Sequence, residues 1–262
     1  MSYKNKTESY NFWVDRIKKK KPNQVCTNDV ALDTLETNQI LSKLTNNVNI
    51  LEIGCGNGLM YKEIRKKFNI NKYIGTDFVQ ELIDICNKEK SNLKDEFLKY
   101  DMTEINKTSF KDKFDFIISK RAVQNVLDAN LQIKTIDTLG HFLKQDGLMI
   151  LVESSSKAQK FINKERLKYN LDLIKPPFHN MFLDDDIIKK YDFKNVEILD
   201  INPFSSDFYY ITRIIYARLA NEYLKEKPNY DHPLQKIAIS MSENLSTVDY
   251  AQIKTFTFKK KK

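Results

Sequence analysis

We predict an α/β fold with a doubly wound, mostly parallel sheet, and three features of the sequence lead to this prediction. Strand and helix patterns alternate regularly from residue 49 to residue 154. The strand patterns are apolar runs without polar alternation, which is typical of strands covered on both faces. The first of them, NILEIGCGNG at 49–58, runs directly into three glycines. Repeating βα units of this length indicate parallel strands flanked by helices.

The expected elements follow in chain order. An amphipathic helix at 30–44 comes first, with its N-cap among Thr27, Asn28 and Asp29. Five strands are expected at residues 49–53, 72–77, 96–102, 114–119 and 148–154. The helices between them are expected at 58–68, 79–90 and 130–144. After Ser156 a helical segment to about residue 171 precedes two further strands at 195–201 and 206–213, and the rest of the chain is expected to be mostly helical.

The domain organisation follows from where this pattern starts and where it is interrupted. Residues 1–29 are polar apart from an aromatic island, so we expect a loosely structured arm or a short helix there. We expect residues 30–262 to form one domain. About forty residues separate the fifth and sixth strands, too many for a plain connection and too patterned for disorder. We expect a helical cap inserted at about 157–190, over the carboxyl edge of the sheet.

Composition indicates a globular protein. The chain has 262 residues, of which 41% are hydrophobic, and it is long enough to bury a core. No apolar run approaches the roughly 20 residues needed to cross a bilayer, and the first residues lack the features of a signal peptide. We expect a cytoplasmic protein without a membrane span. Its three cysteines show no CxxC pairing, and we expect no metal site.

The net charge of +8 is concentrated in two lysine runs, at 18–21 and 259–262. Outside these runs, 35 basic residues balance 35 acidic ones. A nucleic-acid enzyme usually carries a basic stripe on its folded surface, so we expect no nucleic-acid partner and interpret the runs as solvated, flexible segments. The alternative is that they attract an anionic substrate, RNA or a membrane surface.

The glycine-rich turn indicates a ligand. In open parallel sheets, ligands bind at the carboxyl ends of the strands, and glycines let the backbone approach them closely. The dinucleotide signature GxGxxG would need a glycine where this chain has Leu59. Asp77, at the end of the second strand, can accept hydrogen bonds from both ribose hydroxyls of an adenosine. Asp101, after the third strand, can accept from an adenine amino group while the Met102 N–H donates.

The segments LEIGCGNG, GTD, YDM, FDFIIS and LKQDGLMILVES occur in an order and spacing that resemble the class I S-adenosylmethionine-dependent methyltransferases. The resemblance covers about residues 30–156. It implies a Rossmann-like, seven-stranded sheet with an antiparallel terminal strand, and S-adenosylmethionine (SAM) as cofactor. The cofactor-binding residues that it implies are Glu52, Gly54, Cys55, Gly56, Gly58, Asp77, Phe78, Asp101, Met102 and Ser119.

Three residues are candidates for catalysis because they follow the fourth and fifth strands or lie on the cap. Arg121 follows the fourth strand, and Glu153 closes the fifth. His179 lies behind two prolines in the cap, and a histidine pKa suits proton removal near neutrality. A structural role is the alternative for each of them: a surface salt bridge for Arg121, an ion pair for Glu153 and packing for His179.

Further residues are candidates for binding the methyl acceptor. Gln124 and Asn125 follow the fourth strand, and Asn163, Arg166 and Asn170 share one face of the cap helix. Tyr209 and Arg213 point to one side of the predicted last strand, and Tyr210 to the other. The alternatives are a helix start for Gln124 and Asn125, a solvated helix face for the three cap residues, and core or edge packing for the residues of the predicted last strand.

The resemblance implies a SAM-dependent methyltransferase, and we expect it to act on a hydroxyl or amine of a small molecule such as a sugar or a natural-product intermediate. The NPPY-type tetrapeptide of enzymes that methylate nucleic-acid bases or glutamine is absent. One alternative is an RNA methyltransferase that uses the lysine runs for phosphate contacts. Another is an NAD-dependent oxidoreductase of Rossmann type, which fits Asp77 but neither Leu59 nor Asp101. A protein that binds SAM without catalysis is a third.

Overall fold

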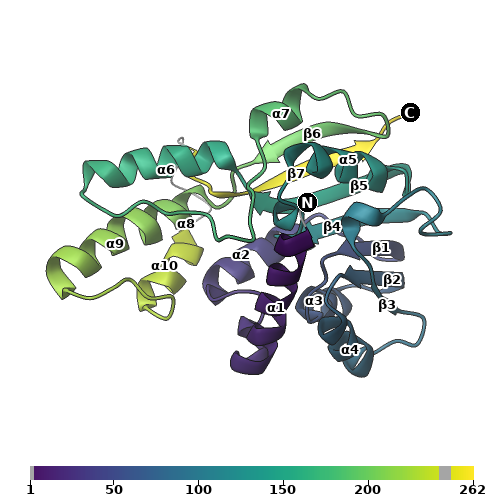
Figure 1. Ribbon diagram of the computed structural model, residues 1–262, viewed down its shortest axis with the longest axis horizontal. Coiled ribbons are helices and arrows are strands. Elements are labelled where there is room, and N and C mark those ends of the chain that lie inside the picture. The colour runs from purple at the N-terminus through teal and green to yellow at the C-terminus, as the bar shows by residue number, and fades with distance from the viewer. Residues whose placement is uncertain (1–2, 242–248) are drawn as a thin grey trace.

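A computed structural model describes residues 3–241 and 249–262, and its centre is one seven-stranded sheet (Figure 1). The strands are β1 (Val48–Ile53), β2 (Ile70–Asp77), β3 (Glu96–Lys99), β4 (Phe114–Lys120), β5 (Leu143–Ser154), β6 (Val196–Asn202) and β7 (Ile253–Lys260). Their order in the sheet is β3-β2-β1-β4-β5-β7-β6. Strands β1 to β5 pair in parallel, and β7 is antiparallel to both of its neighbours. The predicted fold class is confirmed.

Helices cover both faces of this sheet. The α-helices are α1 (Tyr3–Lys19), α2 (Val30–Leu41), α3 (Leu59–Lys67), α4 (Gln80–Glu89), α5 (Ala129–Gly140), α6 (Ser156–Lys168), α7 (Asp185–Lys190), α8 (Ser206–Tyr210), α9 (Tyr216–Leu219) and α10 (Pro233–Met241). Two π-helical segments, Ile211–Ile215 and Ala220–Leu224, extend α8 and α9 into one continuous helical run. Helices α6, α8, α9 and α10 form a lobe at one end of the sheet (Figure 1). None of the described helices is long and apolar enough to cross a membrane.

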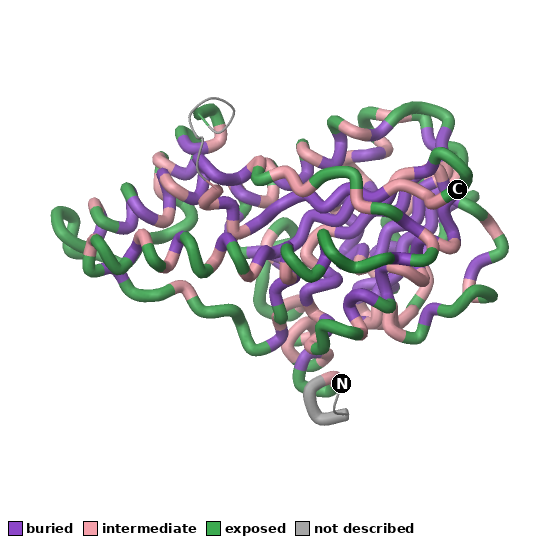
Figure 2. The backbone as a smooth tube through the Cα atoms, turned by 90° about the horizontal axis from the view of Figure 1, so that it is seen from above, coloured by how far each residue is buried: buried purple, intermediate pink, exposed green. Residues whose placement is uncertain are grey.

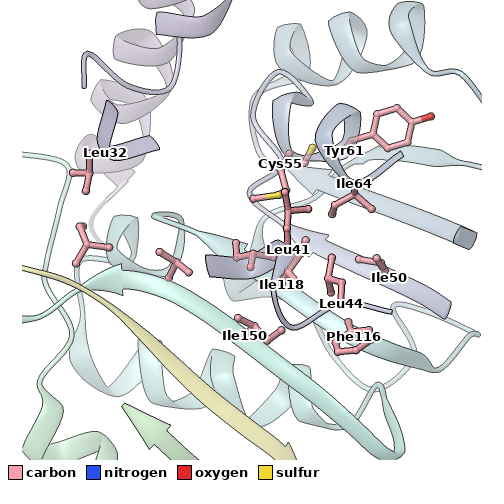
Figure 3. Close-up of a cluster of buried hydrophobic side chains, with 14 of the residues drawn as sticks. Leu32, Leu41, Leu44, Ile50, Cys55, Tyr61, Ile64, Phe116, Ile118 and Ile150 are labelled. Carbon is pink, nitrogen blue, oxygen red and sulfur yellow. The ribbon is translucent and has the colours of Figure 1, made fainter. Parts of the chain in front are cut away.

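The core divides into two layers because neighbouring side chains of a strand point to opposite faces. Ile50 of β1 packs with α2 and α3, together with Ile118 of β4 and Ile150 of β5 (Figure 3). The next residue of β1, Leu51, packs on the other face, in the cluster that contains α5. Burial is therefore concentrated along the strands, with exposed positions on the outer turns of the helices (Figure 2). Coverage on both faces explains why these strands lack polar alternation.

The prediction of a last strand at 206–213 is wrong. That segment is helical, and α8 packs against α10 instead of entering the sheet. Its aromatic and β-branched residues satisfy a strand pattern, but they are buried here on a helix face. The last strand is β7, in which Phe256 and Phe258 alternate with Thr255 and Thr257, and all four residues are buried. Because Tyr209 and Arg213 are four residues apart, they share a helix face.

The interpretation of the second lysine run as a flexible segment is also wrong. Lys259 and Lys260 belong to β7, where the Lys259 ammonium pairs with Glu197 at 2.7 Å. Lys260 donates to the Gly140 carbonyl at 2.8 Å, and Lys261 pairs with Asp192 at 2.6 Å. The first run, at residues 18–21, is exposed at the end of α1, as expected for a solvated segment. Within the predicted arm, α1 is a helix of 17 residues that ends at Lys19, inside the lysine run.

The turn after β1 demands glycine at position 54, which yields a test of the fold. Gly54 has a φ of +71°, and a Cβ there would lie 2.1 Å from the Ala122 Cβ. We expect Gly54→Ala to lower the free energy of unfolding by about 2 to 4 kcal/mol, from left-handed strain and overpacking together. Urea denaturation measures this change.

The matched control is the double variant Gly54→Ala/Ala122→Gly, in which the clash with the Ala122 methyl is absent and only the backbone strain remains. We expect Gly54→Ala to lower the free energy of unfolding less in the Ala122→Gly background than in the unmodified protein. Equal losses in the two backgrounds would show that the close approach of these two residues has no energetic consequence.

Candidate functional site

The glycine turn is held to the neighbouring strand by backbone hydrogen bonds. The Thr76 carbonyl at the end of β2 accepts from the Gly54 N–H at 2.7 Å and from the Cys55 N–H at 2.9 Å. Gly54, Gly56 and Gly58 all have positive φ values, which side chains disfavour. The turn therefore exposes backbone at the carboxyl ends of β1 and β2, where open parallel sheets bind ligands.

A cavity, here called the glycine cavity, opens over this turn. The predicted cofactor-binding residues that line it are Glu52, Gly54, Cys55, Gly56, Asp77, Phe78, Asp101 and Met102. The other two predicted residues lie behind its wall. Gly58 is the N-cap of α3 and faces the Cys86 thiol, and Ser119 is fully buried and donates to Glu153 at 2.9 Å.

Asp77 connects the cavity to the glycine turn. Its carboxylate accepts from the Gly56 N–H and from the Val79 N–H, both at 3.0 Å. The residue is 8% exposed, and burial raises its pKa to about 6 in spite of the hydrogen bonds from backbone N–H groups. Asp77 therefore braces the turn and presents a carboxylate to the cavity.

Asp101 lies across the cavity from the turn and pairs with the N-terminal helix. The Lys6 ammonium is 2.6 Å from one carboxylate oxygen, and the other oxygen accepts from the Thr103 N–H at 2.8 Å. Burial alone would raise the pKa of Asp101, but the hydrogen bonds from Lys6 and Thr103 outweigh it and lower the pKa. Lys6, Ser9 and Trp13 of α1 all line the cavity, a contribution from the arm that sequence reasoning missed.

Glu52 connects two neighbouring strands, β1 and β2, inside the sheet. It is buried in β1 and accepts a short hydrogen bond from the Tyr73 hydroxyl of β2. Burial raises its pKa to about 7. This position fits the predicted role of steadying the glycine turn.

A second cavity, here called the side chamber, adjoins the glycine cavity. Five residues line both of them: Trp13, Cys26, Thr27, Arg121 and Asn125. Predicted residues that line only the side chamber are Gln124, His179, Tyr209 and Arg213. The fold thus brings together residues from α1, the turn after β4, the loop after α6 and the helical run that begins with α8.

His179 is buried in an aromatic cluster that joins α1 to the loop after α6. Its ring lies 4.3 Å from the Phe12 ring and 5.4 Å from the Trp13 ring, measured between centroids. Burial, and then the charge of Arg16, lowers its pKa to about 4. Its Nδ1 atom is buried without a hydrogen-bond partner among the described residues. A neutral imidazole therefore lines the side chamber at physiological pH.

Arg121 is the centre of an ion-pair network at the boundary of the two cavities. Its guanidinium lies 3.0 Å from Asp33 and 3.1 Å from Glu36, both on α2. Glu36 is fully buried, and burial raises its pKa to about 7 although the Arg121 charge opposes the shift. Arg121 also has a φ of +56°, an uncommon backbone conformation for a non-glycine residue. Arg121 thus holds α2 against the turn after β4.

Glu153 does not reach either cavity, so the prediction of a catalytic role conflicts with the structure. The residue is fully buried, and its carboxylate accepts from Ala122 N–H and Val123 N–H at 3.0 Å and from Gln124 N–H at 3.1 Å. These bonds, with that from Ser119, organise the turn after β4. Burial nevertheless raises its pKa to about 7. Glu153 is a structural anchor for that turn.

The predicted acceptor-binding face of the cap helix is also structural. Asn163 exchanges two hydrogen bonds with the backbone of Ile174, and Arg166 donates to the carbonyls of Asp172 and Arg213. Asn170 is exposed after the end of α6, and Tyr210 stacks on Tyr250 at 5.0 Å. None of Asn163, Arg166, Asn170 and Tyr210 lines the side chamber. Long side chains on α6 are used to fix the loop that carries His179.

Among the described residues, no group of three or more His, Cys, Asp or Glu residues could hold a metal ion.

The anchoring role of Glu153 can be tested by its effect on stability. We expect Glu153→Ala to lower the free energy of unfolding by at least about 3 kcal/mol, because several buried donors would lose their acceptor. Urea denaturation measures the change, with Glu197→Ala as the exposed control, for which we expect a much smaller loss of stability. An unchanged stability in Glu153→Ala would contradict the anchoring role.

Comparisons with known proteins agree with this geometry. A family model described as a methyltransferase domain matches residues 44–203. A malonyl-(acyl-carrier protein) O-methyltransferase of Calditerrivibrio nitroreducens is 35% identical over 123 residues, which is 46% of this chain and 45% of the relative. The chain therefore spans less than half of the length of that curated relative.

Two solved structures share the fold at low sequence identity. The N-methyltransferase NodS from Bradyrhizobium japonicum, in complex with S-adenosyl-L-homocysteine (SAH), has a TM-score of 0.57 and 11% identity, covering 96% of this chain and 100% of its own. A TehB-like SAM-dependent methyltransferase from Corynebacterium glutamicum has a TM-score of 0.52 and 14% identity, covering 87% of this chain and 88% of its own. The family model covers more than half of the chain, and the chain therefore belongs to the methyltransferase domain family, with the class I SAM-dependent fold.

Proposed function

We propose that this protein transfers a methyl group from SAM to a hydroxyl or amine of a small molecule. The observation that carries the proposal is the pair of adjoining cavities, which share Trp13, Cys26, Thr27, Arg121 and Asn125. One cavity offers the features that a nucleoside and an amino acid need, and the other is a separate chamber for an acceptor. Methyl transfer needs this arrangement, because positioning the two reactants accounts for much of the acceleration.

The residues of the glycine cavity fit SAM. A Cβ at Gly56 would lie 2.6 Å from the Cys26 thiol, so the turn packs tightly against Cys26, which lines both cavities. Asp77 would accept from the ribose hydroxyls, and Asp101 from the adenine amino group in place of Lys6. SAM supplies an activated methyl group on a positively charged sulfur. Trp13 and the side chains of α1 would exclude water from that group.

In the side chamber, His179 lines the space proposed for the nucleophile and is neutral at pH 7. Burial lowers its pKa to about 4, which makes it a poor base near neutrality, so we propose it as a positioning residue and not as the proton acceptor that its residue type suggested. A base is needed only where the nucleophile must lose a proton. Arg121 is proposed as a positioning residue, because its guanidinium is held by Asp33 and Glu36 at the boundary of the cavities.

The names of similar proteins include different acceptor types. The curated relative is named for O-methylation of a malonyl group on a carrier protein, and NodS is an N-methyltransferase. Their acceptors are properties of those proteins. For this chain we propose an acceptor small enough to enter the side chamber, with a sugar or a natural-product intermediate as the leading classes.

The cofactor assignment predicts a pH-dependent affinity for SAH. Trp13 is the chain's single tryptophan and lines both cavities, so its fluorescence reports binding. Ribose hydroxyls donate to ionised Asp77, whose pKa is about 6 in the free protein. We expect the affinity to fall as the pH is lowered from 7.5 to 5, by up to about tenfold per pH unit below pH 6. Asp101 has a lowered pKa and would stay ionised over that range.

Variants connect this effect to one carboxylate. We expect Asp77→Ala to weaken SAH binding by at least about tenfold and to flatten the pH dependence, because two hydrogen bonds to a charged group are lost. Asp84→Ala, at an exposed position of α4, is the matched control and should bind like the unmodified protein. Tighter binding of NAD than of SAH would contradict the proposal and favour an oxidoreductase.

A further inference from the structure

The charged residues that line the side chamber are mostly basic. Among the described residues, Asp29 is its single acidic residue, whereas the basic ones are Arg16, Arg121, Arg213 and Lys175. A cleft in which one sign of charge prevails attracts groups of the opposite sign. The side chamber is therefore a candidate site for an acidic group of the acceptor.

These basic residues differ in how far protein carboxylates compensate their charge. Arg121 is held between Asp33 and Glu36. Arg16 donates to backbone carbonyls and to the Asn28 side chain, and it forms no ion pair within the described part of the chain. The lysine of the chamber is exposed. The positive charge of the chamber thus exceeds what its own carboxylate and those of α2 balance.

Arg213 is anchored on one side and open on another. Its Nη2 pairs with Asp29, while its Nε and Nη1 have no hydrogen-bond partner among the described residues. Both of these nitrogens are accessible, because no Arg213 atom occurs among the buried polar atoms that lack a partner. The other oxygen of Asp29 accepts from the Leu32 N–H at 2.9 Å and so caps α2. Arg213 is thus a guanidinium fixed in place with N–H groups left for an oxyanion.

Two neutral donors line the same chamber. Gln124 Oε1 accepts from the Ser154 N–H at 2.9 Å, so the NH₂ end of this amide is the free one. Gln124 Nε2 and the Tyr209 hydroxyl have no partner among the described residues, and neither atom is fully buried. The Tyr209 ring lies beside the Arg213 guanidinium, with its centroid at 5.4 Å. An oxyanion on Arg213 would therefore have further donors in the same wall of the protein.

Aromatic rings frame Arg213. Its guanidinium lies 5.3 Å from the centroid of Tyr230, which lines the side chamber together with Tyr209 and Trp13. Rings contribute apolar contact area and favour stacking with a second ring. The chamber therefore suits an acceptor in which an acidic group is attached to a planar or apolar body.

The acidic group and the methylated group would occupy different places. Arg213 and Gln124 line the side chamber but not the glycine cavity, whereas Cys26 and Asn125 line both. The methyl group of SAM would arrive at the boundary that the shared residues mark. An anion held by Arg213 would therefore serve as an anchor, and a second group of the same molecule would react.

We infer that the side chamber binds an acceptor through a compact oxyanion, a carboxylate or a phosphate, that rests on Arg213 with Gln124 and Tyr209 as further donors. The methyl group goes to a hydroxyl or amine elsewhere on that acceptor. This inference rests on the proposed methyltransferase function and narrows its substrate class to acidic molecules.

The test uses the full chain saturated with SAH and three probes that share one ring. They are 3-hydroxybenzoate, 3-hydroxyphenyl phosphate and the uncharged 3-hydroxybenzamide. Saturation-transfer NMR and calorimetry measure their dissociation constants. We expect at least one of the two anions to bind at least about tenfold more tightly than the amide, the effect of a hydrogen bond to a charged group. The tighter anion identifies the acidic group as carboxylate or phosphate.

Two results would overturn the inference. One is an amide that binds as tightly as both anions or more tightly. The other is a chamber that binds none of the three probes at millimolar concentration.

A variant of Arg213 locates the effect. We expect Arg213→Lys to weaken binding of the tighter anion about tenfold, because an ammonium group that pairs with Asp29 lacks the forked donors of a guanidinium. Arg218→Lys is the matched control, since Arg218 belongs to the same helical run, pairs with Glu222 at 2.9 Å and lies outside both cavities. Unchanged anion binding in a folded Arg213→Lys protein would contradict the role of Arg213.

A second variant guards against misfolding. If Arg213→Lys melts well below Arg218→Lys, Tyr209→Phe decides, because it removes a hydroxyl that has no partner among the described residues. We expect it to weaken anion binding at least about threefold, and unchanged binding there would contradict the inference.

The SAH titration followed by Trp13 fluorescence keeps the two proposals apart. Failure to bind SAH would refute the methyltransferase function. Intact SAH binding without a preference for the anions would refute only the inference about the acceptor.

Discussion

The hydrogen bonds between the Thr76 carbonyl and the amides of Gly54 and Cys55 are the constraint on which the site depends. They tie the turn after β1 to the end of β2, and this requires a backbone that bends three times into the left-handed region. Glycine meets that requirement at little cost, whereas other residues would be strained. Asp77 reinforces the same turn through the Gly56 N–H, so the carboxylate that faces the cavity also shapes it.

Buried carboxylates organise the rest of the site. Glu153 gathers three consecutive backbone N–H groups after β4, and Glu36 and Asp33 hold Arg121 against α2. Burial raises the pKa of both Glu36 and Glu153 to about 7, and it outweighs the Arg121 charge beside Glu36 and the hydrogen bonds that Glu153 accepts. This network fixes the turn that carries Arg121 and Asn125, and so sets the boundary between the two cavities.

The side chamber is assembled from segments that are distant in the chain. Helix α1 contributes Trp13, the turn after β4 contributes Asn125, and the loop after α6 contributes His179. The aromatic contacts of Phe12 with His179 and Phe178 connect the first and last of these segments. The side chamber is therefore built by a helix, a turn and a loop, whereas the glycine cavity lies at the ends of the strands, so the two cavities depend on different parts of the scaffold.

The sequence by itself determined the five parallel strands β1 to β5, because apolar runs that alternate with helical patterns leave few other arrangements. The same local signals located Gly54, Asp77 and Asp101, which follow directly from the ends of strands. Residues 206–213 were misread because aromatic and β-branched residues are compatible with a strand or with a buried helix face, and their packing against α10 decided the outcome. Strand β7 was missed because the lysines at its end suggested a solvated segment. The acidic partners of these lysines lie on β6 and in the loop after α7, which only the fold brings close.

Tertiary structure alone decided which polar side chains face the cavities. Glu153 and Arg166 resemble catalytic or binding residues in sequence, yet in the fold they bind protein groups: Glu153 accepts from backbone N–H groups after β4, and Arg166 donates to two carbonyls. Lys6 gave no sequence signal, because its role arises from the position of α1 beside Asp101. The pattern of a chain reports burial and backbone geometry, which are local, whereas a side chain's free donors and acceptors depend on neighbours that only the folded structure brings together.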